Sequence, residues 1–107
     1  MARSRQMYRQ GDVLIERVSR LPKTLTPVKP EAGRLILARG EATGHHHSID
    51  ATVGTLSLDE GGVMFLTVEE LTEVQHQEHA PVTVDPGTYR VTRQREYSPE
   101  AIRNVTD

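Results

Sequence analysis

The amino-acid sequence predicts an all-β fold: a small single-domain barrel or sandwich of about seven to eight short strands, followed by a short C-terminal helix. Apolar residues recur in short alternating runs, and turn signals rich in Gly, Pro and Asp separate these runs. The chain has 107 residues, the size of one domain. It contains one Phe and no Trp, so its core must be built mainly from Val, Leu and Ile.

The first third of the chain is basic and rich in proline. We expect residues 1–10 to form a polar, basic arm, and residues 11–18 to form a largely buried strand. Three prolines in residues 19–33 exclude a continuous helix or a central strand, so this segment is predicted to be an extended loop. Residues 34–40 are the second predicted strand.

The middle of the chain predicts four further strands. Residues 46–51 and 55–59 are two short strands divided by Gly54. Residues 63–68 follow a Glu-Gly-Gly turn and form the most apolar strand. Residues 69–77 are compatible with a short helix or a strand, and their β-favouring neighbours favour the strand.

The last predicted elements are two strands and a helix. Residues 80–84 form a strand, an Asp-Pro-Gly turn follows, and residues 88–96 alternate as a strand. Residues 98–106 then begin as a helix, because Ser98 is a good N-cap and Pro99 suits the first helical position.

The net charge of −2 conceals a strong segregation. Residues 1–39 carry nine Lys or Arg and three acids, whereas residues 40–89 carry nine acids, all five histidines and no Lys or Arg. Residues 90–107 carry four Arg and three acids. This pattern fits a region kept free of competing cations for a bound metal. It also fits basic flanks that pair with the acidic middle, in the same chain or in a second copy.

Composition also excludes several classes of function. The absence of cysteine excludes disulfides, thiolate catalysis and cysteine-ligated zinc. No segment is apolar for long enough to span a bilayer, and the basic N-terminus is followed by no apolar signal core, so we expect no membrane association and a cytoplasmic location. The nucleophile-elbow, P-loop and dinucleotide-binding motifs are absent from the sequence.

All five histidines lie in two short segments, "GEATGHHHSID" and "HQEHAP". In a strand, His45 and His47 point to one face about 7 Å apart, and His46 points to the other face and toward the surface. Two imidazoles in this arrangement can converge on one metal ion. The alternative is that these histidines lie on a polar loop and contact water and backbone.

The second segment offers further ligands. His76 and Glu78 share a face if the segment is extended, and His79 faces the other way unless a bulge redirects it. We therefore expect His45, His47 and His79 to be ligands, with His76 or Glu78 in a fourth place. Glu78 is alternatively a general base. Such a nitrogen-rich, thiolate-free set suits divalent zinc, iron, manganese or nickel.

The C-terminal arginines suggest a second kind of site. Arg93 and Arg95 are co-facial and Tyr97 continues the same alternation, so the three are candidate binding residues for a carboxylate or phosphate of a substrate. The alternative is that these arginines pair with the acidic middle of the chain. We expect little nucleic-acid binding, because the total charge is acidic and no aromatic residues alternate with the basic ones.

A Gly-rich turn that leads into His-x-His, in a chain of short strands, resembles the cupin superfamily of metal-binding β-barrels. That resemblance implies a metal-dependent oxygenase or isomerase, or a non-catalytic binding protein. Taken together, "QGDVL", "TGHHHSI", "EHAPV" and "RQREY" also look similar to small bacterial and phage proteins without assigned activity, which implies a stand-alone domain.

Two functional hypotheses follow. The first is a small β-barrel protein that binds a divalent metal, either as an enzyme of the oxygenase, isomerase or hydrolase type acting on a small molecule, or as a binding module. The second is a non-enzymatic structural or interaction protein, such as an assembly subunit or phage-related adaptor, that forms homo-oligomers through its basic ends and acidic middle.

Overall fold

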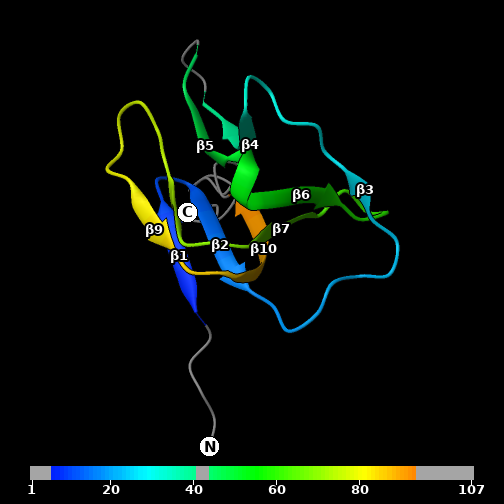
Figure 1. Ribbon diagram of the computed structural model, residues 1–107. Coiled ribbons are helices and arrows are strands. Elements are labelled where there is room, and N and C mark those ends of the chain that lie inside the picture. The colour runs from blue at the N-terminus through cyan, green and yellow to red at the C-terminus, as the bar shows by residue number, and fades with distance from the viewer. Residues whose placement is uncertain (1–5, 41–43, 94–107) are drawn as a thin grey trace, which may run out of the picture.

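The computed structural model describes residues 6–40 and 44–93 and confirms the all-β class (Figure 1). Ten strands and one 3-10 turn, and no α-helix, are present in these residues. In chain order they are β1 (Met7–Gln10), β2 (Val13–Arg17), β3 (Thr26–Pro27), β4 (Arg34–Arg39), β5 (His46–Asp50), η1 (Ala51–Val53), β6 (Gly54–Leu58), β7 (Met64–Val68), β8 (Thr72–Val74), β9 (Val82–Val84) and β10 (Gly87–Arg93).

Six of the strands form one antiparallel sheet in the order β1-β2-β10-β7-β6-β3. Two antiparallel pairs, β4-β5 and β8-β9, lie beside it, and β9 runs next to β1 (Figure 1). Within the described ranges these strands do not join into one closed barrel. The coarser expectation of a multi-strand antiparallel fold is therefore confirmed.

The core is aliphatic, as the composition predicted. Alternate residues of β2, β4, β7 and β10 point inward, because side chains on a strand alternate between its two faces. Tyr89 is fully buried and is the largest core side chain. Its hydroxyl donates to the backbone oxygen of Asp85 at 2.6 Å, which removes the cost of burying that polar group. The other members of the core are Val13, Ile15, Leu35, Leu37, Ile49, Leu56, Leu66, Val68, Val74, Val84 and Val91.

The predicted basic arm is partly wrong, because Met7–Gln10 form strand β1. β1 pairs with β2 through a tight turn at Gly11 and Asp12, and Gly11 supplies the positive φ of +60° that such a turn needs. The sequence concealed this strand because its buried residue at the sheet edge is polar: Gln10 is 3% exposed.

The remaining predicted elements agree with the structure where it describes them. Residues 69–77, compatible with helix or strand, contain β8. The Pro-rich segment 19–33 is irregular apart from the two-residue strand β3. The predicted helix 98–106 lies outside the described residues. Among those described, no helix has the length and apolar character needed to cross a membrane.

Candidate metal centre

The fold brings the two histidine segments to one place. Strand β5 carries His46 and His47, and its next residue, Ser48, forms a two-way backbone bridge with Gln75. The Ser48 amide donates to the Gln75 carbonyl at 3.0 Å, and the Gln75 amide donates back at 2.8 Å. Because Gln75 directly precedes the loop of residues 76–81, this bridge places that loop beside β5.

Four imidazole rings then lie against one another, and we call His45, His47, His76 and His79 the histidine cluster. The His47 ring centroid lies 4.4 Å from that of His76 and 5.8 Å from that of His79. The His76 ring lies 5.6 Å from His45 and 4.6 Å from His79. The structure therefore brings together the four histidines that the sequence proposed as ligands, from segments about thirty residues apart.

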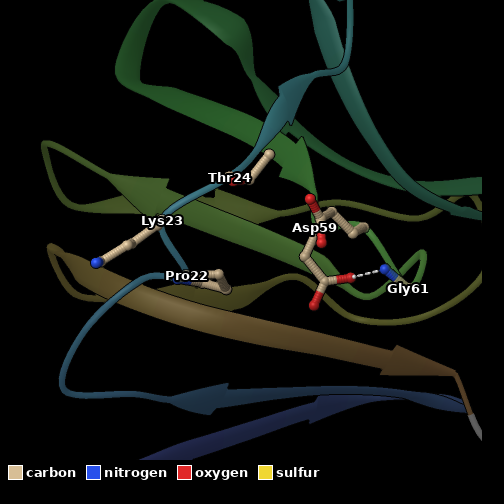
Figure 2. A pocket seen from close by; sticks show the side chains of 6 residues that line it. Pro22, Lys23, Thr24, Asp59 and Gly61 are labelled. Carbon is tan, nitrogen blue, oxygen red and sulfur yellow. Dashed lines mark hydrogen bonds between the residues drawn. The ribbon is translucent and has the colours of Figure 1, made fainter.

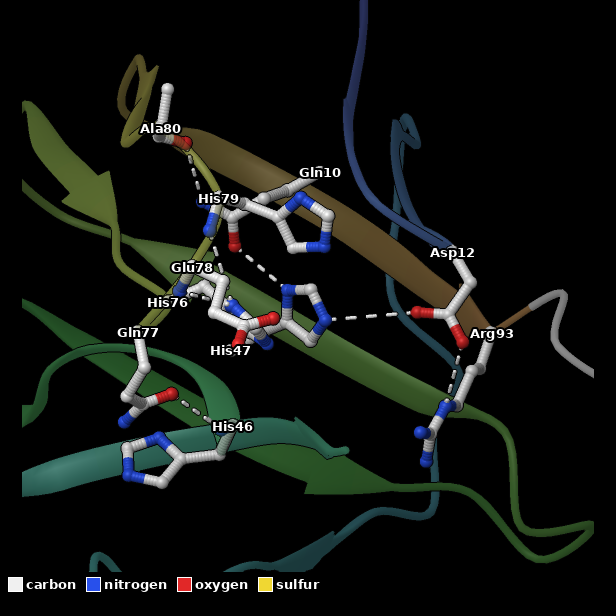
Figure 3. Close-up of polar contacts among 10 residues, drawn as sticks. All are labelled: Gln10, Asp12, His46, His47, His76, Gln77, Glu78, His79, Ala80 and Arg93. Carbon is white, nitrogen blue, oxygen red and sulfur yellow. Dashed lines mark hydrogen bonds and ion pairs between the residues drawn. The ribbon is translucent and has the colours of Figure 1, made fainter. Parts of the chain in front are cut away.

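His47 is the anchored member of the histidine cluster. It is 2% exposed, and its Nδ1 lies 2.7 Å from Oε1 of the buried Gln10 (Figure 3). Gln10 Nε2 donates to the backbone oxygens of Val74 and Ala80, each at 2.9 Å. These two bonds fix the amide so that Oε1 is its acceptor, and Nδ1 of His47 must therefore carry the ring proton. The Nε2 lone pair of His47 is left free, as in metal-ligating histidines whose other nitrogen is hydrogen-bonded.

That free nitrogen faces a carboxylate. His47 Nε2 lies 3.6 Å from Asp12 Oδ1, a separation too long for a hydrogen bond (Figure 3). The other oxygen of Asp12 accepts from Arg93 Nε at 3.3 Å. Partial burial raises the pKa of Asp12, but the hydrogen bond and positive charge of Arg93 outweigh it and lower that pKa below its ordinary value. Asp12 therefore presents a negative charge to His47.

The cluster also disfavours the charged form of two of its members, His47 and His76. Burial, followed by repulsion from His76, lowers the pKa of His47 to about 4, although Asp12 acts in the opposite direction. Burial and the neighbouring His79 and His45 likewise lower the pKa of His76. Neutral imidazoles retain a lone pair at neutral pH, which is the form that binds metals.

His76 uses its lone pair within the loop. Its Nδ1 accepts from the backbone N–H of Glu78 at 3.0 Å and of His79 at 3.3 Å. The ring proton of His76 is therefore on Nε2, and in this conformation the ring offers no free lone pair to a metal. His79 lies over Gly11, where an added Cβ would come within 2.7 Å of His79 Nε2.

Glu78, the predicted fourth ligand or general base, lies at the exposed rim of the cluster. Its Oε2 is 3.9 Å from Nε2 of His45, and its side chain is 71% exposed. Across residues 6–40 and 44–93, no group of three or more His, Asp or Glu side chains is arranged to hold a metal ion as it stands. The rings instead pack through their faces and edges, so metal binding requires side-chain rotation.

Of the three predicted anion-binding residues, the structure describes only Arg93. Arg93 pairs with Asp12, so it contacts an acid of the N-terminal part and not the acidic middle that we considered as its alternative partner. Arg95 and Tyr97 lie outside the described residues. The ion pairs Arg39–Glu31 and Arg90–Glu16 also use carboxylates from the first 39 residues.

Sequence reasoning missed Gln10 and Asp12. Both flank Gly11 in the "QGD" turn, where a polar residue at the end of an edge strand carries no metal-ligand signature. A buried glutamine and a carboxylate on the two sides of a tight turn point to one site only after β1 pairs with β2. Both residues contact His47, which lies 37 positions after Gln10 and 35 positions after Asp12 in the chain.

A separate hollow of about 370 Å³ is lined by Pro22, Lys23, Thr24, Asp59, Glu60 and Gly61 (Figure 2). Asp59 Oδ1 accepts from the backbone N–H groups of Gly61 at 2.8 Å and Val63 at 2.9 Å. The carboxylate thus stabilises its own turn, and this hollow offers no comparable cluster of side chains.

The comparison with known families identifies a family for this chain, and no activity is known for that family. Residues 9–94 match the family described as "Domain of unknown function (DUF8820)". The chain belongs to this family. The matched range includes both histidine segments and the Gln10–Asp12 turn. No curated protein and no solved structure matches the chain. The resemblance to cupins stays a prediction from the histidine motif.

Proposed function

We propose that this DUF8820 protein binds one divalent transition metal at the histidine cluster, with His47 Nε2 and Asp12 as the first two ligands. The observation that carries the proposal is the pair of facing acceptors: a free ring nitrogen and a carboxylate oxygen 3.6 Å apart. Two lone pairs so placed repel each other, and a cation between them removes the repulsion. Ligands on one tetrahedral zinc ion lie about 3.3 Å apart, close to this separation.

His45 and His79 supply the remaining ligands. The His45 side chain is 25% exposed and His79 is exposed, so both rings have room to turn toward Asp12. Imidazoles with a carboxylate, and no thiolate, suit zinc, iron, manganese or nickel. In an enzyme of the oxygenase, isomerase or hydrolase type, the metal would act as a Lewis acid. Glu78, beside His45, would be placed to accept a proton.

The test is elemental analysis of untagged protein purified without added metal. We expect about one zinc, iron, manganese or nickel per chain, and loss of that metal in the His45→Ala/His47→Ala double variant. Asp12→Asn should weaken affinity by roughly 10-fold or more, because it removes a charged ligand. His46→Ala is the matched control, since its side chain lies on the other face of β5, and it should retain the metal.

Trace metal that is unchanged in the double variant would contradict the proposal. So would a loss of metal in His46→Ala as large as in His45→Ala/His47→Ala, because the metal would then not depend on the His47 face of the strand.

A second candidate function is self-association through the acidic middle of the chain. Glu69, Glu70 and Glu73 are exposed and form no ion pair with another described residue, and Leu71 between them is 61% exposed. An acidic patch around an apolar residue can bind the basic chain ends of a second copy.

Sedimentation at low and high salt tests this self-association. Dimers that dissociate as salt is added, and that are weaker in Glu69→Gln/Glu70→Gln, support it. A monomer at low salt contradicts it.

A further inference from the structure

Beside the histidine cluster is a second polar space, which we call the Arg34 hollow. It has a volume of about 360 Å³ and lies on the side of β5 to which His46 and Ser48 point. This volume falls in the lower range of small-molecule binding sites. The lining residues are Arg34, His46, Ser48, Gln75, His76 and Gln77.

Arg34 brings a partly buried positive charge to this hollow. Its Nε donates to Ser48 Oγ at 3.1 Å and its Nη2 to the Ser48 backbone oxygen at 3.0 Å. A guanidinium has five N–H donors, so these two bonds hold the group in place and leave three donors for a ligand. In the described part of the chain, no carboxylate forms an ion pair with Arg34. Asp50, opposite Arg34 in the strand pairing, uses Oδ1 to accept from Thr52. These hydrogen bonds lower the pKa of Asp50, and the charge of Arg34 adds to that effect from beyond ion-pair distance.

Two other residues of the hollow, Gln77 and His76, offer N–H donors. Gln77 Oε1 accepts from the backbone N–H of His46 at 2.8 Å, which leaves the two N–H groups of the Gln77 amide free (Figure 3). Since Nδ1 of His76 accepts from the loop backbone, its Nε2 carries a proton. A cation with free N–H donors beside it is suited to an anion, which would share the charge of Arg34 with the exposed Asp50.

His46 adds an independent sign that a ligand belongs here. Its Nδ1 is buried and has no hydrogen-bond partner among the described residues. A buried polar atom without a partner costs free energy, and a ligand would recover that energy once the His46 ring turns to expose Nδ1 to the hollow.

We propose that the Arg34 hollow binds a small oxyanion, the carboxylate or phosphate group of a small molecule. Arg34 forms the charged contact, and Gln77, His46 and His76 supply further hydrogen bonds. This site goes beyond the metal site and does not depend on it, although His76 borders both, so that a bound anion would lie next to the histidine cluster.

The experiment is a titration of metal-free, ¹⁵N-labelled protein in Tris chloride with inorganic phosphate and, separately, with succinate. We expect saturable shifts of the backbone amide signals of His46, Gln75 and Gln77 with at least one probe. Arg34→Met should weaken that binding by roughly 10-fold or more, because it removes a charge-assisted contact. Arg20→Met, a change at an exposed arginine away from the hollow, is the matched control and should leave affinity unchanged.

The exposed Gln77 provides a second variant that does not depend on the packing of Arg34: Gln77→Leu should weaken binding several-fold and leave the melting temperature nearly unchanged. Phosphate preferred over succinate, or the reverse, identifies the head group, and either supports the proposal. No saturable shift with either probe up to roughly 20 mM overturns it. So does equal weakening in Arg34→Met and Arg20→Met.

The two sites can fail separately. His45→Ala/His47→Ala should lose the metal and keep the anion affinity, and Arg34→Met should lose the anion and keep the metal. If every variant lost both the metal and the anion affinity, the Arg34 hollow would not be a site separate from the metal site.

Discussion

His47 on strand β5 is held by its neighbours, whereas the histidines of residues 76–79 lie on a loop that is largely exposed. The Gln10 amide fixes the His47 tautomer, and the backbone ladder with β4 fixes its place. In the loop, His76 is positioned by bonds to its own backbone neighbours, and His79 rests on Gly11. The comparison shows a fixed imidazole on a strand beside a loop whose histidines are held mainly by their own segment. This division of roles suits a site that closes when a metal binds.

The largest expected effect comes from removing the support of His47. Gln10→Ala leaves His47 Nδ1 and the backbone oxygens of Val74 and Ala80 without their partner in a buried place. We expect the free energy of unfolding to fall by about 2–4 kcal/mol. Urea denaturation measures this change. Gln75→Ala, at an exposed glutamine, is the control and should change stability by less than about 0.5 kcal/mol. A Gln10→Ala variant as stable as the control would mean that His47 is not held by this amide.

The next effect is a dependence of stability on pH in the metal-free protein. The pKa of His47 is about 4 in the fold against 6.5 for the free side chain, so the unfolded chain binds more protons between these values. The free energy of unfolding should therefore carry no penalty from His47 above about pH 6.5 and should decrease as the pH falls toward 4. The contribution of His47 is up to about 3 kcal/mol.

His76, whose pKa is also lowered, adds to this loss in the same direction. Urea denaturation at a series of pH values measures the slope, and His47→Gln should flatten it. A slope unchanged in His47→Gln would assign the pH dependence to other groups.

The smallest effect is expected for alanine at Gly11. A matched variant at Gly33 distinguishes the contact of Gly11 with His79 from backbone strain. Gly11 and Gly33 both have positive φ, at +60° and +79°, so an alanine at either position is strained by about 1–2 kcal/mol. A Cβ at Gly11 would also meet His79 Nε2 at 2.7 Å, whereas a Cβ at Gly33 meets nothing within 4 Å. We expect Gly11→Ala and Gly33→Ala to lose similar stability, but only Gly11→Ala to displace His79 and weaken metal binding. Equal metal affinity in the two variants would show that the place of His79 over Gly11 does not govern metal binding.

Local sequence patterns predicted the all-β class, the aliphatic core and most strands, because alternating apolar residues and turn signals are local properties. The sequence also identified the histidine segments. The tertiary structure decided what these segments face. The Ser48–Gln75 bridge, the edge strand ending at Gln10 and the pairing of Asp12 with Arg93 join residues far apart in the chain. Such contacts depend on how strands pair in space, and a polar glutamine or aspartate in a turn carries no local pattern that predicts its partner.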